Sequence, residues 1–177
     1  VQLAQYYNFP NSTISGATDS KLPDNQAGYE KAINLTLAVQ TGANLITQAA
    51  GTQAGLMATS LEAYVIDNEM LGAILSTGKQ IEVNEETCSV EAIKKVVEGD
   101  GHFLGQAATF NRMSTDFVYP EVADRQAYDS WVANGKPNIN SNAKTKVESI
   151  LLEHKPNYIP KDCDTQIRKL FDIRIRI

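Results

Sequence analysis

Residues 12–50, STISGATDSKLPDNQAGYEKAINLTLAVQTGANLITQAA, decide the order of the structural elements. Residues 12–17 are β-branched or small, and they predict a short strand. A polar connection follows, and Asp24 is then placed to cap a helix over residues 25–41. Residues 43–50 are mostly apolar, so we predict a second strand that is buried on both faces. A strand, a helix and a strand in succession predict an α/β fold with a parallel sheet.

The predicted helix carries an apolar stripe of Tyr29, Ile33 and Leu37, with Ala32, Leu35 and Val39 alongside it. Because the stripe repeats at helical spacing, we expect it to face the core. Gly42 follows the helix at the position where glycine often ends one. The glycine-bearing segment 51–59 then follows the second strand as a loop.

After residue 59 the sequence pattern becomes helical. Thr59 and Glu62 have the spacing of a capping box, which predicts a helix that ends near residue 76. Further helices are predicted near residues 85–98, 104–114, 122–134, 140–154 and 162–173. We therefore expect two regions, with strand–helix units in residues 1–59 and a helical extension packed on them in residues 60–177.

Composition limits the classes of protein. The chain has 177 residues, a hydrophobic content of 42% and a net charge of −5, as in a soluble globular protein. We expect no nucleic-acid partner, because a phosphate binder shows a basic face. We also expect no membrane partner, because no apolar run approaches the roughly 20 residues of a membrane span. Two distant cysteines form no disulfide framework, which favours the cytoplasm.

The first residues, VQLAQYYNFP, have the pattern of a helix that runs into a turn at Pro10. A native protein rarely begins within a helix. Two parallel strands joined by one helix also do not make a stable sheet alone. We therefore expect this chain to be the C-terminal piece of a longer polypeptide, whose earlier strands complete the sheet.

Polar side chains gather where the two predicted strands end. Ligands of parallel α/β folds bind at the carboxyl ends of the strands. Carboxylates and amides suit a cationic or polar small molecule better than a phosphate, which favours a glycine-rich loop with Lys or Arg. The alternative is a solvated turn followed by a helix cap. The candidate substrate-binding residues are Asp19, Asp24, Gln26, Glu30 and Gln48.

Other reactive side chains lack partners at useful spacing. His102 and His154 do not form a metal-binding motif. Asp67 and Glu69 are two residues apart, so they do not share a helix face and do not form an acid–base pair. We therefore predict no bound metal and name no catalytic residue.

Five segments in succession resemble the C-terminal part of the trimethylamine methyltransferase family. They are TDSKLPDNQAGYEKA, NLITQAAG, LEAYVIDNEMLGAI, GHFLGQAAT and DRQAYDSWVANG, within residues 10–155. The resemblance implies a TIM (β/α)8 barrel. Its last two strands would be residues 12–17 and 43–50, followed by a helical tail. It also implies methyl transfer from a methylated amine to the cobalt of a corrinoid (cobalamin). A separate corrinoid protein would carry this cofactor, so this chain would bind none directly.

The family divides by the methyl donor. Enzymes for trimethylamine carry pyrrolysine in the barrel, whereas relatives without it take quaternary amines such as glycine betaine. The equivalent position here lies near residues 15–18, which are all ordinary, so the resemblance implies the pyrrolysine-lacking group. Many relatives carry His where this chain has Gln48, whose amide does not titrate near neutral pH. A substrate carboxylate that meets His in those relatives would meet an amide here.

Three functions follow as hypotheses. The first is a corrinoid-dependent methyltransferase whose substrate, a methylated amine, lies among the five candidate residues. The second is a helical interaction module that docks a corrinoid protein or another subunit and has no chemistry of its own. The third is a barrel that binds a methylated amine without turning it over. We expect a homo-oligomer in each case.

Overall fold

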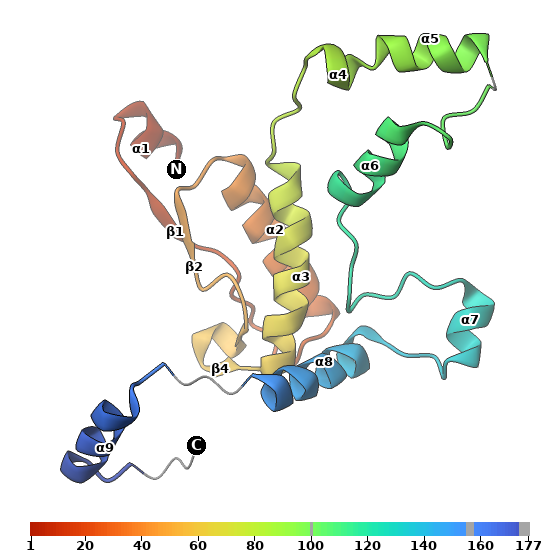
Figure 1. Ribbon diagram of the computed structural model, residues 1–177. Coiled ribbons are helices and arrows are strands. Elements are labelled where there is room, and N and C mark those ends of the chain that lie inside the picture. Colours follow the sequence, from red (N-terminus) through yellow and green to blue (C-terminus); the bar gives the residue numbers. More distant parts are fainter. Residues whose placement is uncertain (100, 155–157, 174–177) are drawn as a thin grey trace.

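The computed structural model describes residues 1–99, 101–154 and 158–173. Figure 1 shows α2, α3 and α8 near the centre, with α4 to α6 and α9 reaching outward. The chain is helix-rich with few strands, which is compatible with the predicted α/β class. The elements are α1 (Gln2–Tyr6), β1 (Ser12–Ile14), α2 (Asn25–Gln40), β2 (Leu45–Thr47), β3 (Thr52–Gln53), η1 (Ala54–Leu56), β4 (Ala58–Thr59), α3 (Leu61–Thr77), α4 (Glu85–Cys88), α5 (Val90–Glu98), α6 (Ala107–Thr115), α7 (Tyr128–Ala133), α8 (Ile139–Glu153) and α9 (Lys161–Leu170).

β1 and β2 are parallel neighbours, and this confirms the predicted pairing. Their register runs from Ser12 opposite Leu45 to Ile14 opposite Thr47. Helix α2 connects them, as a parallel pair requires. Among the described residues these are the only parallel strands, and they form one strand–helix–strand unit.

Both parallel strands are shorter than the predicted 12–17 and 43–50. Gly16 has a φ of +130° and Gln48 has a φ of +55°, and neither value belongs to an extended strand. The predicted glycine loop at 51–59 contains a short antiparallel pair, β3 with β4, that the sequence pattern did not indicate. The structure therefore places irregular backbone directly after each parallel strand.

Helix α2 buries a different face from the predicted one. Tyr29, Ile33 and Leu37 are 58%, 57% and 58% exposed, so their assignment to the core was wrong, whereas Leu35, predicted alongside them, is fully buried. The opposite stripe packs against α3, and no described segment covers the predicted stripe. The buried residues of α2 are Ala27, Lys31, Leu35 and Ala38.

Helix α3 is the central helix, because it packs against both α2 and α8. Its N-cap is Ser60, whose hydroxyl accepts a hydrogen bond from the amide of Ala63 at 3.2 Å. The Ser60 hydroxyl also donates to Glu62 at 2.8 Å. The predicted capping box at Thr59 was therefore wrong by one residue, although the helix itself is confirmed.

A buried ion pair joins α2 to α3. The Lys31 ammonium lies 2.6 Å from the Asp67 carboxylate, and the two side chains are only 1% and 6% exposed. The same carboxylate oxygen accepts the backbone amide of Gly51 at 2.8 Å. Because Gly51 follows β2, this cluster fixes two helices and the second strand-end loop relative to one another.

Two predicted helices are shorter or divided. The helix predicted over 85–98 is divided into α4 and α5 at Ser89, whose φ is +52°. The helix predicted over 122–134 begins only at Tyr128. Three backbone amides before it donate to the Glu69 carboxylate, so this stretch is held in a non-helical conformation.

The remaining helices lie near their predicted positions. α1 confirms the predicted N-terminal helix, and α6, α8 and α9 correspond to the segments predicted near 104–114, 140–154 and 162–173. α8 begins with a capping box between Asn138 and Ser141. Helix α9 lies away from the central helices (Figure 1). Residues 174–177, at the end of the sequence FDIRIRI, lie outside the described residues.

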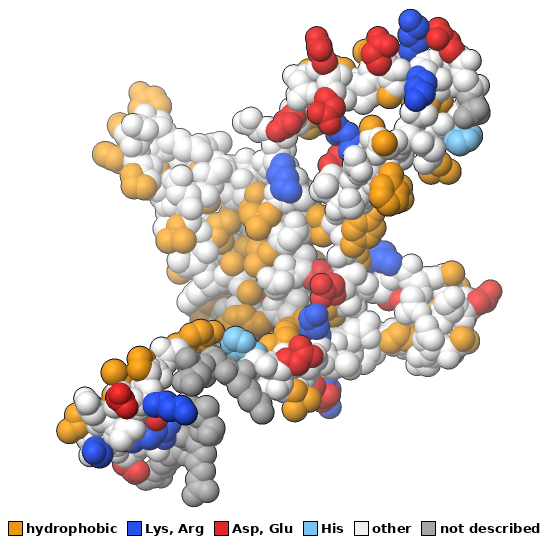
Figure 2. Space-filling view, in the orientation of Figure 1, with side chains coloured by type: hydrophobic (Ala, Val, Ile, Leu, Met, Phe, Trp, Pro, Cys, Tyr) orange, Lys and Arg blue, Asp and Glu red, His pale blue; other side chains and the backbone are white. Residues whose placement is uncertain are grey.

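The chain exposes a large apolar surface. Its accessible surface is 13842 Å², whereas a compact monomer of this mass exposes about 8,500 Å². The exposed apolar side chains include Ile14 and Leu45 of the sheet. They also include Tyr29, Ile33 and Leu37, which we call the outer stripe of α2. They also occur along residues 79–99 and 101–118, which we call the arm, and Figure 2 shows them there. None of the described helices is long and apolar enough to cross a membrane.

Removing one charge of the buried pair should leave the other charge unpaired inside the protein. We expect Lys31→Met to lower the free energy of unfolding by about 3–5 kcal/mol, measured by urea denaturation of the chain. The exposed Arg112–Asp116 pair provides the matched control. There, Arg112→Met should cost less than about 1 kcal/mol. Equal, small losses in both variants would show that the buried pair does not organise the fold.

Candidate functional site

The backbones that follow β1 and β2 are in close contact. A Cβ atom at Gly16 would stand 2.7 Å from the carbonyl oxygen of Gln48 and 2.8 Å from the Cα atom of Ala49. Real Cβ atoms essentially never approach backbone this closely, so no side chain fits at Gly16. The carboxyl ends of the two strands therefore meet at one place, as expected for parallel neighbours.

Glu30 holds the first strand-end loop against α2. Its carboxylate accepts hydrogen bonds from the Thr18 hydroxyl at 2.5 Å, the Asp19 amide at 3.0 Å and the Gln26 side-chain amide at 2.9 Å. These hydrogen bonds, that from Thr18 foremost, lower the pKa of Glu30 below its ordinary value of 4.5. The Glu30 carboxylate and the side-chain NH2 group of Gln26, both from predicted substrate residues, thus have partners within the protein.

Asp24 caps α2, as its position in the sequence predicted. Its Oδ1 atom accepts the backbone amide of Ala27 at 3.0 Å. This hydrogen bond, followed by one from the Ser20 side chain, lowers the pKa of Asp24. The helix-cap alternative for Asp24 is confirmed.

Asp19 and Gln48 are the two predicted site residues with unoccupied side chains. Both are exposed, and in the described part of the chain neither side chain makes a hydrogen bond or ion pair. Lys21 donates to the backbone carbonyl of Asp19 at 2.7 Å, not to its carboxylate. The Asp19 carboxylate instead lies against Gly55, where a Cβ atom would stand 3.2 Å from Oδ1. Asp19 is therefore the free negative charge of this site.

A turn of left-handed backbone lies beside Asp19. Ala54, Gly55 and Leu56 have φ values of +53°, +59° and +75°, and we call them the left-handed turn. This conformation costs roughly 1–2 kcal/mol at each residue other than glycine. The amides of Ala54 and Gly55 donate to the carbonyls of Ser20 at 2.8 Å and Thr18 at 2.9 Å. These bonds join the two strand-end loops, and we call the joined loops the strand-end platform. Strained turns of this kind cluster at functional sites.

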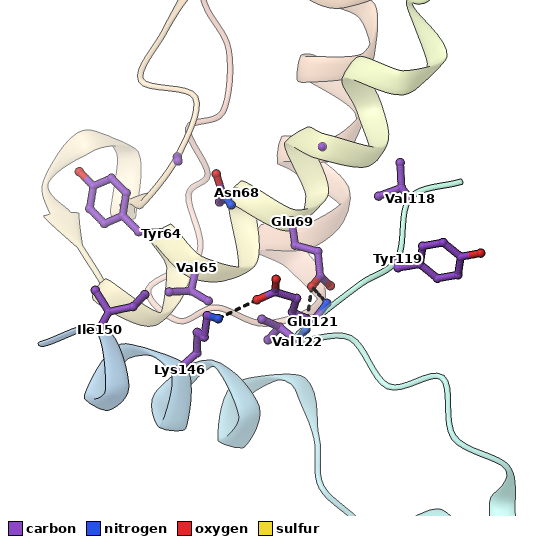
Figure 3. A pocket seen from close by; sticks show the side chains of 12 residues that line it. Tyr64, Val65, Asn68, Glu69, Val118, Tyr119, Glu121, Val122, Lys146 and Ile150 are labelled. Carbon is purple, nitrogen blue, oxygen red and sulfur yellow. Dashed lines mark hydrogen bonds and ion pairs between the residues drawn. The ribbon is translucent and has the colours of Figure 1, made fainter. Parts of the chain in front are cut away.

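A hollow of about 560 Å³ lies between α3, residues 118–122 and α8 (Figure 3). On one wall Glu69 accepts the backbone amides of residues 121–123 at 2.6, 2.7 and 2.9 Å. Lys146 pairs with Glu121 at 2.7 Å, which lowers the pKa of Glu121 and raises that of Lys146. Because Glu69, Glu121 and Lys146 each have a partner, the charged side chains of this hollow join the helices to one another.

Sequence reasoning missed the structural roles of Asp67 and Glu69. It predicted that they do not form an acid–base pair, and the structure places them on different partners. The sequence does contain a sign of the buried ion pair. Lys31 lies four residues after Ala27 and four before Leu35, so the three share one face of the helix. A charged residue within a stripe of small or apolar residues indicates a buried charge that needs a partner.

The histidines and cysteines form no metal centre in the described chain. Among those residues, no group of three or more His, Cys, Asp or Glu is placed to hold a metal ion. The His154 ring nitrogen lies 3.3 Å from the Tyr158 hydroxyl. Cys88 and Cys163 are exposed free thiols.

Comparison with known proteins gives consistent relatives. A family model described as trimethylamine methyltransferase matches residues 1–176. The chain is 36% identical to glycine betaine methyltransferase of Desulfitobacterium hafniense, over 94% of this chain and 33% of that protein. It is 37% identical to trimethylamine methyltransferase MttB of Methanosarcina thermophila, over 91% of this chain and 33% of that protein. The chain thus spans about a third of the length of the curated relatives it matches.

Glu30→Gln should change how stability depends on pH. Because folding lowers the pKa of Glu30, the stability that its carboxylate contributes is present above pH 4.5 and is lost as the pH falls. We expect thermal unfolding midpoints of the variant to fall less between about pH 5 and pH 3 than those of the unmodified chain. Glu148→Gln, an exposed change on α8, should leave the original pH dependence intact. Parallel curves for all three proteins would contradict the role of Glu30.

Proposed function

The chain belongs to the trimethylamine methyltransferase family, and we propose that the whole protein transfers a methyl group from a methylated amine, by preference a quaternary amine, to cobalt. The cobalt is that of a corrinoid carried by a separate protein. Support comes from a match over nearly the entire chain and from relatives named for trimethylamine and glycine betaine. Because this chain covers a third of their length, the activity is proposed for the full-length protein.

We place β1 and β2 as the last two strands of an eight-stranded parallel barrel. Their parallel pairing through one helix supports this placement. Ile14 and Leu45 are 61% and 57% exposed, and the outer stripe of α2 is equally uncovered. Apolar strand and helix faces of this kind are what the other strands and helices of a barrel would cover. The carboxyl ends of β1 and β2 would then open toward the mouth of the barrel.

The proposed substrate class, a methylated amine, rests on the position of the Asp19 carboxylate. It stands at the carboxyl end of a parallel strand, it is exposed, and it has no partner in the described chain. A methylated ammonium carries a fixed positive charge that a carboxylate attracts. Gln48, at the end of the neighbouring strand, offers an amide that can donate to a substrate carboxylate or accept from a hydroxyl.

The proposed reaction needs orientation more than acid–base chemistry. The carbon–nitrogen bond of the donor breaks, and both electrons stay on nitrogen, so a neutral amine leaves. Reduced corrinoid cobalt supplies the electron pair for the new bond to the methyl carbon. The protein's part is to hold the donor with one methyl group directed at the incoming cobalt and to exclude water. Asp19 would bind the donor cation, and it would release the neutral amine readily once the charge is gone.

A quaternary amine is the favoured donor. Relatives named for trimethylamine and for glycine betaine match at similar identity, so their names do not decide between the two. The tight contact at Gly16 supports a site that works without a special side chain at that position. A quaternary nitrogen already carries the charge that lets a neutral amine leave, so it needs no such group.

An interaction module is the second candidate, and the arm favours it. On α5, Val90, Ile93 and Val97 form a stripe whose residues are 64%, 47% and 74% exposed. The arm reaches outward from the central helices (Figure 1). An exposed apolar stripe of this kind is typical of a surface that docks another protein. We propose the corrinoid protein as its partner, with a second copy of the chain as the alternative.

Methyl transfer by the full-length protein should depend on Asp19. With a reduced corrinoid protein as acceptor, a panel of quaternary amines is screened for methyl transfer to cobalt. We expect Asp19→Ala to lower kcat/KM roughly tenfold or more, because it removes the charge that binds the donor. Gln48→Ala should have a smaller effect, largest for a donor that carries a carboxylate.

Asp129→Ala is the matched control for this experiment, because Asp129 is an exposed acid on α7. Its kcat/KM should equal that of the unmodified protein. Asp67→Ala is unsuitable, because it breaks the buried ion pair and lowers stability. Absence of methyl transfer from every amine would refute the proposed function, and equal effects of the Asp19 and Asp129 substitutions would refute the proposed site.

The docking role of the arm predicts a separate kinetic effect. Val97→Asp should raise the KM for the corrinoid protein severalfold, because it places a charge in the apolar stripe. The kcat at saturating corrinoid protein should not change. Leu152→Asp, at an equally exposed position of α8, is the control and should leave both constants unchanged. An unaltered KM for Val97→Asp would remove the arm from the docking surface.

A further inference from the structure

The left-handed turn contains the exposed Leu56, the exposed Met57 follows it, and the free carboxylate of Asp19 lies against Gly55 in the middle of the turn. We propose that this turn binds the N-methyl groups of a quaternary ammonium, while Asp19 supplies the opposite charge. The inference rests on the proposed function, since it names the residues that would recognise the methylated amine. It assigns recognition to the second strand-end loop as well as to the first.

The geometry brings charge and apolar surface together. The Asp19 carboxylate lies against the backbone of Gly55, at the middle of the turn. The turn is anchored through Thr18 and Ser20, which are 3% and 4% exposed. Thr18 is in turn held by the Glu30 carboxylate at 2.5 Å. The position of the turn relative to Asp19 is therefore fixed by buried hydrogen bonds before any ligand arrives.

The chemistry of a quaternary ammonium fits this pairing. Such a cation has no N–H group, so hydrogen bonds to it are not available. It is recognised by an opposite charge and by contacts with its methyl groups. Leu56 is 48% exposed and Met57 is 87% exposed. The Met57 thioether is flexible and polarisable, so it adapts to a cluster of methyl groups.

The strain at Leu56 is a second reason for this assignment. A φ of +75° is natural for glycine and unfavourable for leucine. The Leu56 side chain is about half exposed, so burial in the core does not compensate for the strain. Leu56 directly follows Gly55, against which the free carboxylate lies, and a strained, exposed leucine at this place fits a side chain retained for contact with a ligand.

The three methionines of the chain provide a direct test, because Met57, Met70 and Met113 each give one methyl signal. The full-length protein is prepared with isotope-labelled methionine methyl groups and followed by NMR, and the Met57 signal is identified by its loss in Met57→Leu. It is titrated with choline and, separately, with dimethylbutanol, in which carbon replaces the choline nitrogen. This pair of probes has the same shape and differs in charge.

We expect the Met57 signal to shift saturably with choline and not with dimethylbutanol. The signals of Met70 and Met113 should stay in place. Asp19→Asn should weaken choline binding roughly tenfold, the effect of losing one charged contact. Asp129→Asn is the matched control and should bind choline as the unmodified chain does.

Leu56→Gly separates binding from folding. Glycine adopts a positive φ without strain, so the thermal unfolding midpoint should be unchanged or higher. Choline affinity should nevertheless fall, because the apolar contact is gone. An unshifted Met57 signal, equal shifts with both probes, or full affinity in Asp19→Asn would overturn the proposal. Choline binding at the left-handed turn without any methyl transfer by the full-length protein would refute only the proposed function. Methyl transfer without choline binding at this turn would refute only this inference.

Discussion

The ion pair between Lys31 and Asp67 is the constraint on which the rest of the structure depends. Removing two charges from water costs several kcal/mol for each ion, and only close contact with further hydrogen bonds offsets that cost. The 2.6 Å contact and the Gly51 amide supply both. Since the three groups come from α2, α3 and the loop after β2, their geometry admits one arrangement of these elements. The buried face of α2 is consequently the face that carries Lys31.

The candidate site is built on elements that this cluster holds in place. Gly51 fixes the start of the loop that forms the left-handed turn, and the turn binds the backbone of Thr18 and Ser20. Glu30 then ties the first loop to α2. On the other side of α3, Glu69 anchors the chain that leads to α8 (Figure 3). The hydrogen bonds of these loops fix the backbone that carries the free Asp19 carboxylate before a ligand binds, as a preorganised binding site requires.

Local features could be predicted from the sequence, whereas features set by tertiary partners could not. The cap at Asp24 and the parallel pairing of the two strands depend on short-range patterns, and both are confirmed. The buried face of α2 depends on Asp67, which lies 36 residues away from Lys31, so the more hydrophobic stripe of Tyr29 and its neighbours was chosen wrongly. The left-handed turn was also missed, because the amides of Ala54 and Gly55 donate to Ser20 and Thr18, which are distant in the sequence.

Among the predicted site residues, chemistry alone could not separate ligand groups from structural ones. Asp19 lies in the first strand-end loop and Glu30 in the nearby part of α2, and their hydrogen-bond partners distinguish the two carboxylates. The most direct measurement is a crystal structure of the full-length protein with a quaternary amine bound. The cationic nitrogen should lie within about 6 Å of the Asp19 carboxylate, with its methyl groups against Leu56 and Met57. An amine bound elsewhere, with Asp19 facing only solvent, would contradict the assignment of this strand-end platform as the methyl-donor site.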